Sequence, residues 1–446
     1  MSGSMSRRSV FAAGLAVTST VLVPDVAAAA ETTSSGVKAD EGVDYFAWES
    51  TADWRSGEAD GVVTDNCGRP GIRIGTPSGT VDFTDPHTGN TTSFDVATWT
   101  SPVRESAVAA SELIASWNAD ASQGTWIQVE LEGRYADCET TPWFIMGRWA
   151  AGDGDIARAS VSGQGDSRSS IYTDTFSIDD PTVDRLTAYR LRVSLYRLSG
   201  TGLTPTVWRL GAMTSHVPDR YEVPESVPGV ASGIELDVPT YSQNVHAGRY
   251  PEYGGGGEAW CSPTSSQMVL EYFGRTVPAE DLAWVDPDYD DPQICHAARS
   301  TYDHEYDGCG NWPFNAAYAS DFDDMEAIIT RLGSLSEAEA LIAAGFPIIT
   351  SQAFLEEELD GAGYGTAGHL MVLIGFTEDG DVIANDPASP SNDRVRRVYN
   401  RRQFENIWLR TKRKDANGND AGGTGGVCYL YRQRGQQWPS HLGLPA

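Results

Sequence analysis

Three side chains of this sequence, a cysteine, a histidine and an aspartate in that chain order, are of the types that carry out nucleophilic catalysis on acyl groups. The cysteine, Cys261, follows four glycines at residues 254–257 and directly precedes Ser262 and Pro263. A serine cap followed by a proline is typical of a helix start, so we expect Cys261 at the N-terminus of a helix. The unpaired N–H groups and the positive dipole end there favour a thiolate. Cys261 is therefore a candidate nucleophile.

The histidine and the aspartate lie on two apolar runs that are joined by a turn. His369 opens the run that ends at residue 376, and Asp386 closes the run that begins at residue 382. Asp379-Gly380, between them, is a strong hairpin signal. Because the turn lies midway between the two residues, an antiparallel hairpin brings His369 and Asp386 together at its open end. We expect Asp386 to accept a hydrogen bond from one ring nitrogen while the other nitrogen faces the thiol.

A glutamine upstream of the cysteine could complete such a site. The side-chain amide of Gln243 could stabilise an oxyanion together with the backbone N–H of Cys261. Each residue also has an ordinary interpretation, since a secreted cysteine is usually half of a disulfide, a histidine beside a buried strand usually packs in the core, and Asp-Pro usually marks a turn. The combination, in this order and on these elements, favours catalysis.

The elements around these residues follow from local patterns. Ser262 is expected as the N-cap, Pro263 as the first helical residue and Gly274 as the stop of the helix that carries Cys261. Further helices are expected at 321–332 and at 336–344, the second capped by Ser336. Residues 278–321 show little periodicity and are rich in aspartate, tyrosine and proline, which indicates a surface insertion.

The N-terminal half has a β pattern. Residues 125–132 and 191–195 alternate with period two, and glycine-rich turns separate such runs, which predicts an antiparallel sandwich or jelly roll over residues 31–216. A proline-rich linker is expected at 217–235 and a second domain at 236–446. Eight of the thirteen tryptophans fall in the N-terminal half, where they could stack on sugar rings or, more commonly, pack in the core.

Residues 1–30 have the features of an export signal. Arg7 and Arg8 precede an apolar run at 10–23, and alanines at 27–30 offer a cleavage site, so we expect Sec or twin-arginine export and an extracellular, secreted protein. No later stretch is apolar enough for a membrane span. The net charge of −30 argues against nucleic acid and anionic membranes as partners.

Export permits disulfides among the six cysteines. Cys295 with Cys309 is the better candidate pair, Cys67 with Cys138 is plausible, and Cys428 could be a buried thiol. The cysteines and histidines at positions 295, 296, 304 and 309 match no standard zinc spacing. No metal or organic cofactor is implied.

Four segments together resemble the C39-like peptidases, which are papain-fold cysteine peptidases whose better-known members trim double-glycine leaders inside bacteriocin exporters. The segments are Val238-Pro239-Thr240-Tyr241-Ser242-Gln243, residues 260–274 from Trp260-Cys261-Ser262-Pro263 onward, Gly368-His369-Leu370-Met371-Val372, and Asn385-Asp386-Pro387. The resemblance covers about residues 236–432 and implies an α+β papain-like fold there. It implies roles for four residues, namely Cys261 as nucleophile, His369 as general base and acid, Asp386 as orienting residue and Gln243 as oxyanion donor.

The sequence departs from that family at several points. Ser262 stands where family members commonly have glycine, and the separation of Gln243 and Cys261 is longer than usual. The exporter's transmembrane and ATP-binding parts are absent from this sequence, so a leader-trimming role is not implied.

These observations predict a secreted two-domain cysteine peptidase. It would hydrolyse peptide or isopeptide bonds of a protein or peptide substrate through a thioester intermediate. Two alternatives stay open, a transglutaminase-like acyltransferase with an amine as acceptor, and a non-enzymatic cell-wall or glycan-binding protein with an inactive papain-like domain. The N-terminal sandwich would supply a carbohydrate contact in the last case.

Overall fold

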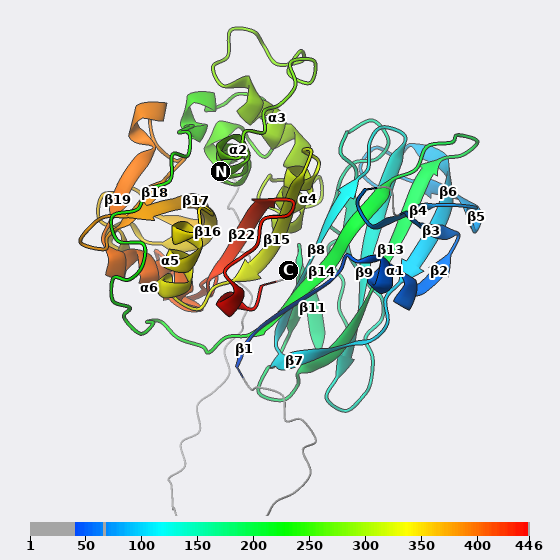
Figure 1. Cartoon of the computed structure of the whole chain (residues 1–446), viewed down its shortest axis with the longest axis horizontal. Helices are drawn as coiled ribbons and strands as arrows, with labels where there is room; N and C mark the ends of the chain where they lie inside the picture. Colours follow the sequence, from blue (N-terminus) through cyan, green and yellow to red (C-terminus); the bar gives the residue numbers. More distant parts are fainter. Residues whose placement is uncertain (1–40, 66–67, 445–446) are drawn as a thin grey trace, which may run out of the picture.

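The computed structural model describes residues 41–65 and 68–444 and shows two strand-rich units side by side (Figure 1). The described residues contain six α-helices, of which only α1 (Thr51–Ser56) belongs to the N-terminal unit. The expected export signal at 1–30 lies outside the described residues. No helix in the described part of the chain has the length and apolar character that a membrane crossing requires.

The N-terminal unit consists of two seven-stranded sheets in which every strand pairing is antiparallel. The first sheet has the order β11 (Ser169–Tyr172), β12 (Thr175–Ile178), β8 (Glu112–Asp120), β14 (Thr206–His216), β4 (Gly71–Ile74) and β3 (Val62–Asp65), with β1 (Gly42–Trp48) on β14. The second has the order β10 (Phe144–Trp149), β9 (Thr125–Tyr135), β13 (Leu186–Leu198), β6 (Thr91–Thr100) and β2 (Glu58–Asp60), with β5 (Gly79–Thr84) on β6 and β7 (Arg104–Ala110) on β13.

Tryptophans of this unit serve mainly as core residues. Six of the eight are at most 3% exposed, namely Trp48, Trp54, Trp99, Trp117, Trp126 and Trp149. Guanidinium groups cover the rings of the two half-buried ones, with Arg192 over Trp143 at 4.2 Å and Arg69 over Trp208 at 4.5 Å. None of the eight therefore offers a bare ring for stacking on sugar.

The C-terminal unit is built on one six-stranded sheet. Its order is β15 (Met325–Arg331), β22 (Val427–Gln433), β16 (Ile348–Phe354), β17 (Thr366–Phe376), β18 (Val382–Asn385) and β19 (Arg396–Tyr399). The helices around it are α2 (Cys261–Tyr272), α3 (Pro292–Thr301), α4 (Trp312–Ser320), α5 (Leu335–Ala343) and α6 (Arg401–Leu409), and a small ribbon pairs β20 (Lys412–Lys414) with β21 (Asp420–Gly422). Helix α2 packs against β17 and against α3 and α4, whereas α6 packs against β16.

Three expectations for this unit were wrong. Residues 321–332 form mainly the strand β15, not a helix, because all seven residues of the strand are buried and such a run has no period that separates helix from strand. The stretch 278–321 is not a surface insertion throughout, since it contains α3 and the fully buried α4. Helix α5 begins one residue early and is capped by Ser334, whose hydroxyl accepts from the Glu337 N–H at 3.3 Å, not by Ser336.

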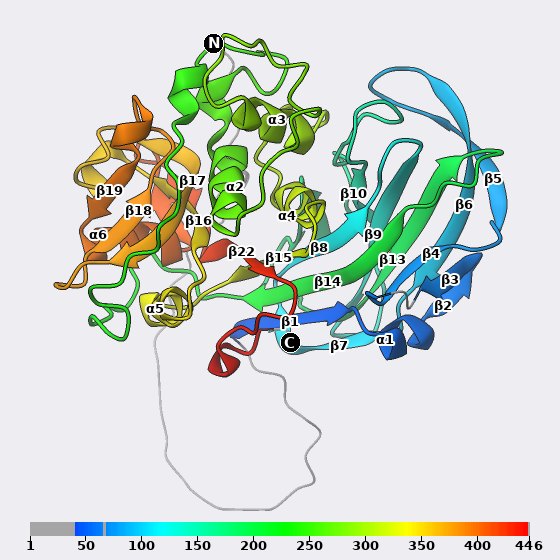
Figure 2. The same ribbon diagram turned by 45° about the horizontal axis from the view of Figure 1, so that its top comes forward.

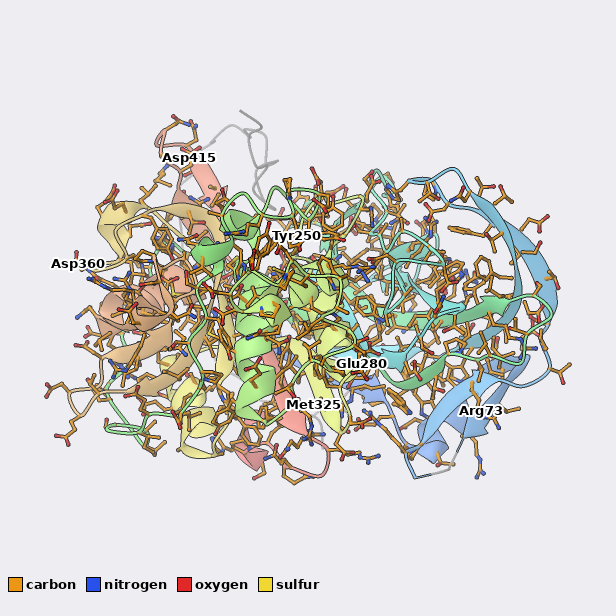
Figure 3. The ribbon with its side chains drawn as sticks, turned by 90° about the horizontal axis from the view of Figure 1, so that it is seen from above. Arg73, Tyr250, Glu280, Met325, Asp360 and Asp415 are labelled. Carbon is orange, nitrogen blue, oxygen red and sulfur yellow. The ribbon has the colours of Figure 1, made fainter. Side chains whose placement is uncertain are left out.

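The two units share one continuous hydrophobic core. Helix α4 packs on β8, and Figure 2 shows it between α2 and the N-terminal sheets. Phe314 of α4 lies against the rings of Trp117 and Trp149, at 6.1 and 5.4 Å between centroids. The buried amide of Asn118 donates to the Ala327 carbonyl at 2.8 Å and accepts from the Ala327 N–H at 3.3 Å. In Figure 3, Met325 at the start of β15 lies between Arg73 and Asp360, which are near opposite ends of the molecule.

Candidate active site

Helix α2 places Cys261 at its first turn. Cys261 is the first helical residue and Trp260 is the N-cap, with no side-chain capping bond. The predicted cap, Ser262, was two residues late, because the buried Ser262 hydroxyl lies 2.8 Å from the Tyr429 hydroxyl instead of capping the helix. As expected, the helix ends just before Gly274, whose φ of +74° suits the left-handed position after a C-cap.

The hairpin of β17 and β18 places the histidine and the aspartate. Val372 pairs with Asn385, so Asp386 directly follows β18 beside the first residues of β17. His369 Nε2 lies 2.9 Å from Asp386 Oδ1, and both side chains are buried. The expected hydrogen bond between these two residues is therefore present.

Asp386 is held by more donors than the sequence indicated. Its Oδ2 accepts from the hydroxyls of Tyr399 at 2.7 Å and Tyr364 at 2.9 Å, and its Oδ1 accepts from the Ala388 N–H at 3.0 Å. Burial alone would raise the pKa of this carboxyl, but the hydrogen bond and charge of His369 and the two tyrosine hydroxyls bring the pKa below its usual value. Asp386 is therefore an ionised acceptor.

Both tyrosines escaped the sequence analysis. Tyr364 stands in a glycine-rich loop and Tyr399 ends the short strand β19, and no spacing links either of them to Asp386. The Tyr364 ring also lies edge-on to the imidazole of His369, with centroids 5.5 Å apart. It thus restricts the orientation of the imidazole as well as the carboxylate.

Cys261 and His369 form a hydrogen-bonded pair of opposite charge. Burial disfavours charge on either group, yet the attraction of the thiolate and the bond to Asp386 raise the pKa of His369. The charge and hydrogen bond of His369, with the backbone N–H groups of Leu370 and Ser262, outweigh the burial of Cys261 and lower its pKa. Because His369 Nε2 serves Asp386, Nδ1 is the nitrogen left for the sulfur. Both shifts favour a thiolate on Cys261 beside an imidazolium on His369.

Gln243 lies beside the segment that leads into Cys261. Its Nε2 donates to the Glu258 carbonyl at 2.6 Å, and its own N–H donates to the Pro387 carbonyl at 2.9 Å. The helical turn Gly257–Ala259 comes so close that a Cβ on Gly257 would lie 2.4 Å from the Gln243 carbonyl oxygen. The second hydrogen of Nε2 remains available for another acceptor.

The remaining cysteines correct the disulfide prediction. Cys295 and Cys309 are free, buried thiols, and each has another neighbour: Cys295 Sγ lies 3.6 Å from His246 Nδ1, and Cys309 Sγ donates to the Ala298 carbonyl at 3.4 Å. Burial raises the pKa of Cys295 to about 12, so it stays a protonated, unreactive thiol.

Two further cysteines are described. Cys428 is a buried free thiol in β22, which is one of the two states left open for it. Cys138 is free and exposed, whereas Cys67, its expected partner, lies outside the described residues. No group of three or more metal-ligating side chains occurs in residues 41–65 and 68–444.

Comparison with known families gives two matches. The model of the peptidase C39 N-terminal domain matches residues 44–215, and the model of the peptidase C39-like family matches residues 235–416. Both halves of the chain are similar to C39-type peptidases. The resemblance expected only for residues 236–432 was thus too narrow, because the N-terminal half also carries a C39-related domain.

Among solved structures, a putative C39-like peptidase from Bacillus anthracis is 17% identical with a TM-score of 0.26, covering 46% of this chain and all of that chain. A β-sandwich carbohydrate-binding module is 12% identical with a TM-score of 0.17, covering 40% of this chain and 62% of that chain. No curated protein matches the sequence.

Proposed function

We propose that the protein is an exported cysteine peptidase that hydrolyses peptide or isopeptide bonds with Cys261 as nucleophile. The observation that carries this proposal is the chain of hydrogen bonds from the partly exposed Cys261 through the buried His369 to the buried Asp386. The lowered pKa of Cys261 favours the thiolate, and the backbone N–H groups and helix dipole at the N-terminus of α2 add to its stabilisation. The two matches to peptidase families support the same reaction class.

Acylation begins when the Cys261 sulfur attacks the carbonyl carbon of the scissile bond. The carbonyl π electrons move onto oxygen, and this oxyanion would accept from the Cys261 N–H, which as the first residue of α2 has no intrahelical acceptor, and from Gln243 Nε2. His369 then gives its Nδ1 proton to the leaving amine as the C–N bond breaks. A thioester on Cys261 results.

Deacylation uses the same groups. His369, now neutral, takes a proton from water, whose oxygen attacks the thioester carbon. The C–S bond breaks, the acid product leaves, and the thiolate and imidazolium are restored. Throughout, the Asp386 carboxylate accepts the hydrogen bond from His369 Nε2. The hydroxyls of Tyr364 and Tyr399 hold the carboxylate in place, and this fixes the plane of the imidazole.

The test is peptide-library digestion by the full chain and by Cys261→Ala, with Cys138→Ser as a matched control at an exposed thiol. We expect no turnover for Cys261→Ala, full turnover for Cys138→Ser and unchanged circular dichroism for both. Product masses distinguish hydrolysis, which adds water, from transfer to an amine. Turnover that survives in Cys261→Ala contradicts the proposal.

For the N-terminal unit we propose a β-sandwich accessory domain that braces the peptidase. The buried Arg158 supports this role, because its guanidinium donates to the carbonyls of Arg299 and Tyr302 at the end of α3, at 3.2 and 3.3 Å. Carbohydrate contact by this domain remains a prediction without an exposed tryptophan to carry it. Export rests on the pattern of residues 1–30, and N-terminal sequencing of secreted protein tests it.

A further inference from the structure

A pocket between the two units has four arginines among its lining residues. It has a volume of about 250 Å³, with Arg69 and Arg209 on its N-terminal side and Arg432 and Arg434 on its C-terminal side. None of the residues of the Cys261 site lines it. Gln433, next to Arg432, donates to the carbonyl of Phe273, which caps the C-terminal end of α2. Phe273 is at the opposite end of α2 from Cys261, which is the first of the twelve residues of the helix.

The charges that line the pocket are not balanced. Four guanidinium groups line the pocket with two carboxylates, those of Glu49 and Glu326, while Arg434 also pairs with Asp324 outside the lining. Glu326 already serves three arginines. Its Oε2 accepts from Arg432 Nε at 3.0 Å and from Arg209 Nη2 at 3.2 Å, while Arg69 Nη2 lies 3.6 Å from Oε1. Glu326 is thus shared by three arginines.

Arg209 shows this shortage of hydrogen-bond acceptors most directly. The side chain is 2% exposed, and its Nε and Nη2 are paired with Glu49 and Glu326. Its Nη1, buried in the wall of the pocket, has no hydrogen-bond partner among the described residues. A buried charged donor without an acceptor is costly, and a bound anion would supply the acceptor.

Arg69 lies on the same side of the pocket as Arg209 and is held there by an aromatic ring. Its guanidinium lies on the face of Trp208, 4.5 Å from the ring centroid, which keeps its N–H groups directed away from the ring. Burial lowers the pKa of Arg69 to about 10, and repulsion by Arg209 and Arg434 adds to this against the attraction of Glu326. The pocket thus concentrates positive charge that its own carboxylates do not neutralise.

We propose that this pocket binds a tetrahedral oxyanion of the phosphate or sulfate class, either free or as a monoester group. Guanidinium groups match such anions because their N–H donors form parallel pairs of bonds to two oxygens. Because residues of both units line the pocket, a bound anion ties the units together and stabilises the folded chain. The inference does not depend on the peptidase reaction, since none of the residues that carry it belongs to the Cys261 site.

The test is calorimetric titration of the full chain with inorganic phosphate at constant ionic strength, so that general screening does not change. Sulfate, a phosphate monoester and acetate are titrated in parallel. We expect saturable binding with one site for phosphate and sulfate, weaker binding of acetate, and a rise in the melting temperature on saturation. If only the monoester binds, the anion is part of a larger ligand. Acetate binding as tightly as phosphate overturns the assignment to a tetrahedral anion.

Substitutions locate the site. Arg69→Gln should weaken phosphate binding at least about ten-fold, which corresponds to about 1.4 kcal/mol, whereas Arg55→Gln on exposed α1 should leave it unchanged. Arg434→Gln, at the rim where Arg434 pairs with Asp324, provides a second variant with less effect on folding. Cys261→Ala should bind phosphate like the unmodified chain. Absence of saturable binding of phosphate, sulfate and the monoester alike, or equal losses in Arg69→Gln and Arg55→Gln, overturns the proposal.

Discussion

Replacing Tyr399 by phenylalanine removes one donor from the buried carboxylate of Asp386 and changes little else. The lost bond is short, 2.7 Å, and its acceptor is ionised, so we expect a loss of about 1.5–3 kcal/mol in the free energy of unfolding at neutral pH. Because the hydrogen bond of Tyr399 helps to lower the pKa of Asp386, its loss should raise that pKa.

The sign of the pH dependence follows from the direction of that pKa. The folded state lowers the pKa of Asp386, so its contribution to stability is present above the pKa of the unfolded state and is lost as the pH falls through the folded value. The destabilisation of Tyr399→Phe should therefore be largest near pH 7 and shrink in acid. A looser imidazole should also lower kcat/KM.

Urea denaturation at pH 7 and at acidic pH measures this difference. Tyr431→Phe is the matched control, because its buried hydroxyl lies 2.9 Å from Ser266 Oγ and donates to the Asn315 carbonyl at 3.1 Å, both uncharged. It should cost about 0.5–1.5 kcal/mol at either pH. Equal, pH-independent losses in the two variants would refute the role given to the Tyr399 hydroxyl.

Two further predictions concern the contact between the two units and the position of Gln243 in the candidate active site. Asn118→Ala leaves both backbone groups of Ala327 without their buried partner and should lower the free energy of unfolding, measured by urea denaturation, by about 2 kcal/mol or more. The control Asn417→Ala, at an exposed position, should change it almost not at all. Equal losses in the two variants would contradict a hydrogen-bonded contact between the two units. Gly257→Ala forces the turn before Cys261 away from Gln243 and should lower kcat more than it raises KM. The control Gly79→Ala, at a glycine with open space around it, should leave both constants unchanged. A fully active Gly257→Ala enzyme would contradict the placement of Gln243.

The sequence was sufficient to place His369 beside Asp386 because two apolar runs and a strong turn signal leave only one way to fold the hairpin. It also placed Cys261 at a helix N-terminus, although the cap was misassigned because the Ser262 hydroxyl bonds to Tyr429, which is distant in the chain. Such long-range bonds leave no trace in local spacing. For the same reason, the sequence analysis did not identify Tyr364 and Tyr399 as partners of Asp386.

Burial explains most of the other differences. A fully buried strand such as β15 lacks the alternation that identifies a strand, and the fully buried α4 lacks the polar face that identifies a helix. The pairing of Cys295 with Cys309 was inferred from their closeness in the chain, but in the fold their thiols have other neighbours, His246 and a backbone carbonyl.

The rate of alkylation of Cys261 by iodoacetamide as a function of pH tests the thiolate and imidazolium pair most directly, with the labelled peptide identified by mass spectrometry. We predict fast labelling well below the ordinary thiol pKa of about 8.5, and loss of that low-pH reactivity in His369→Ala. A Cys261 that reacts only as fast as a free thiol, or equally fast with and without His369, would contradict the account.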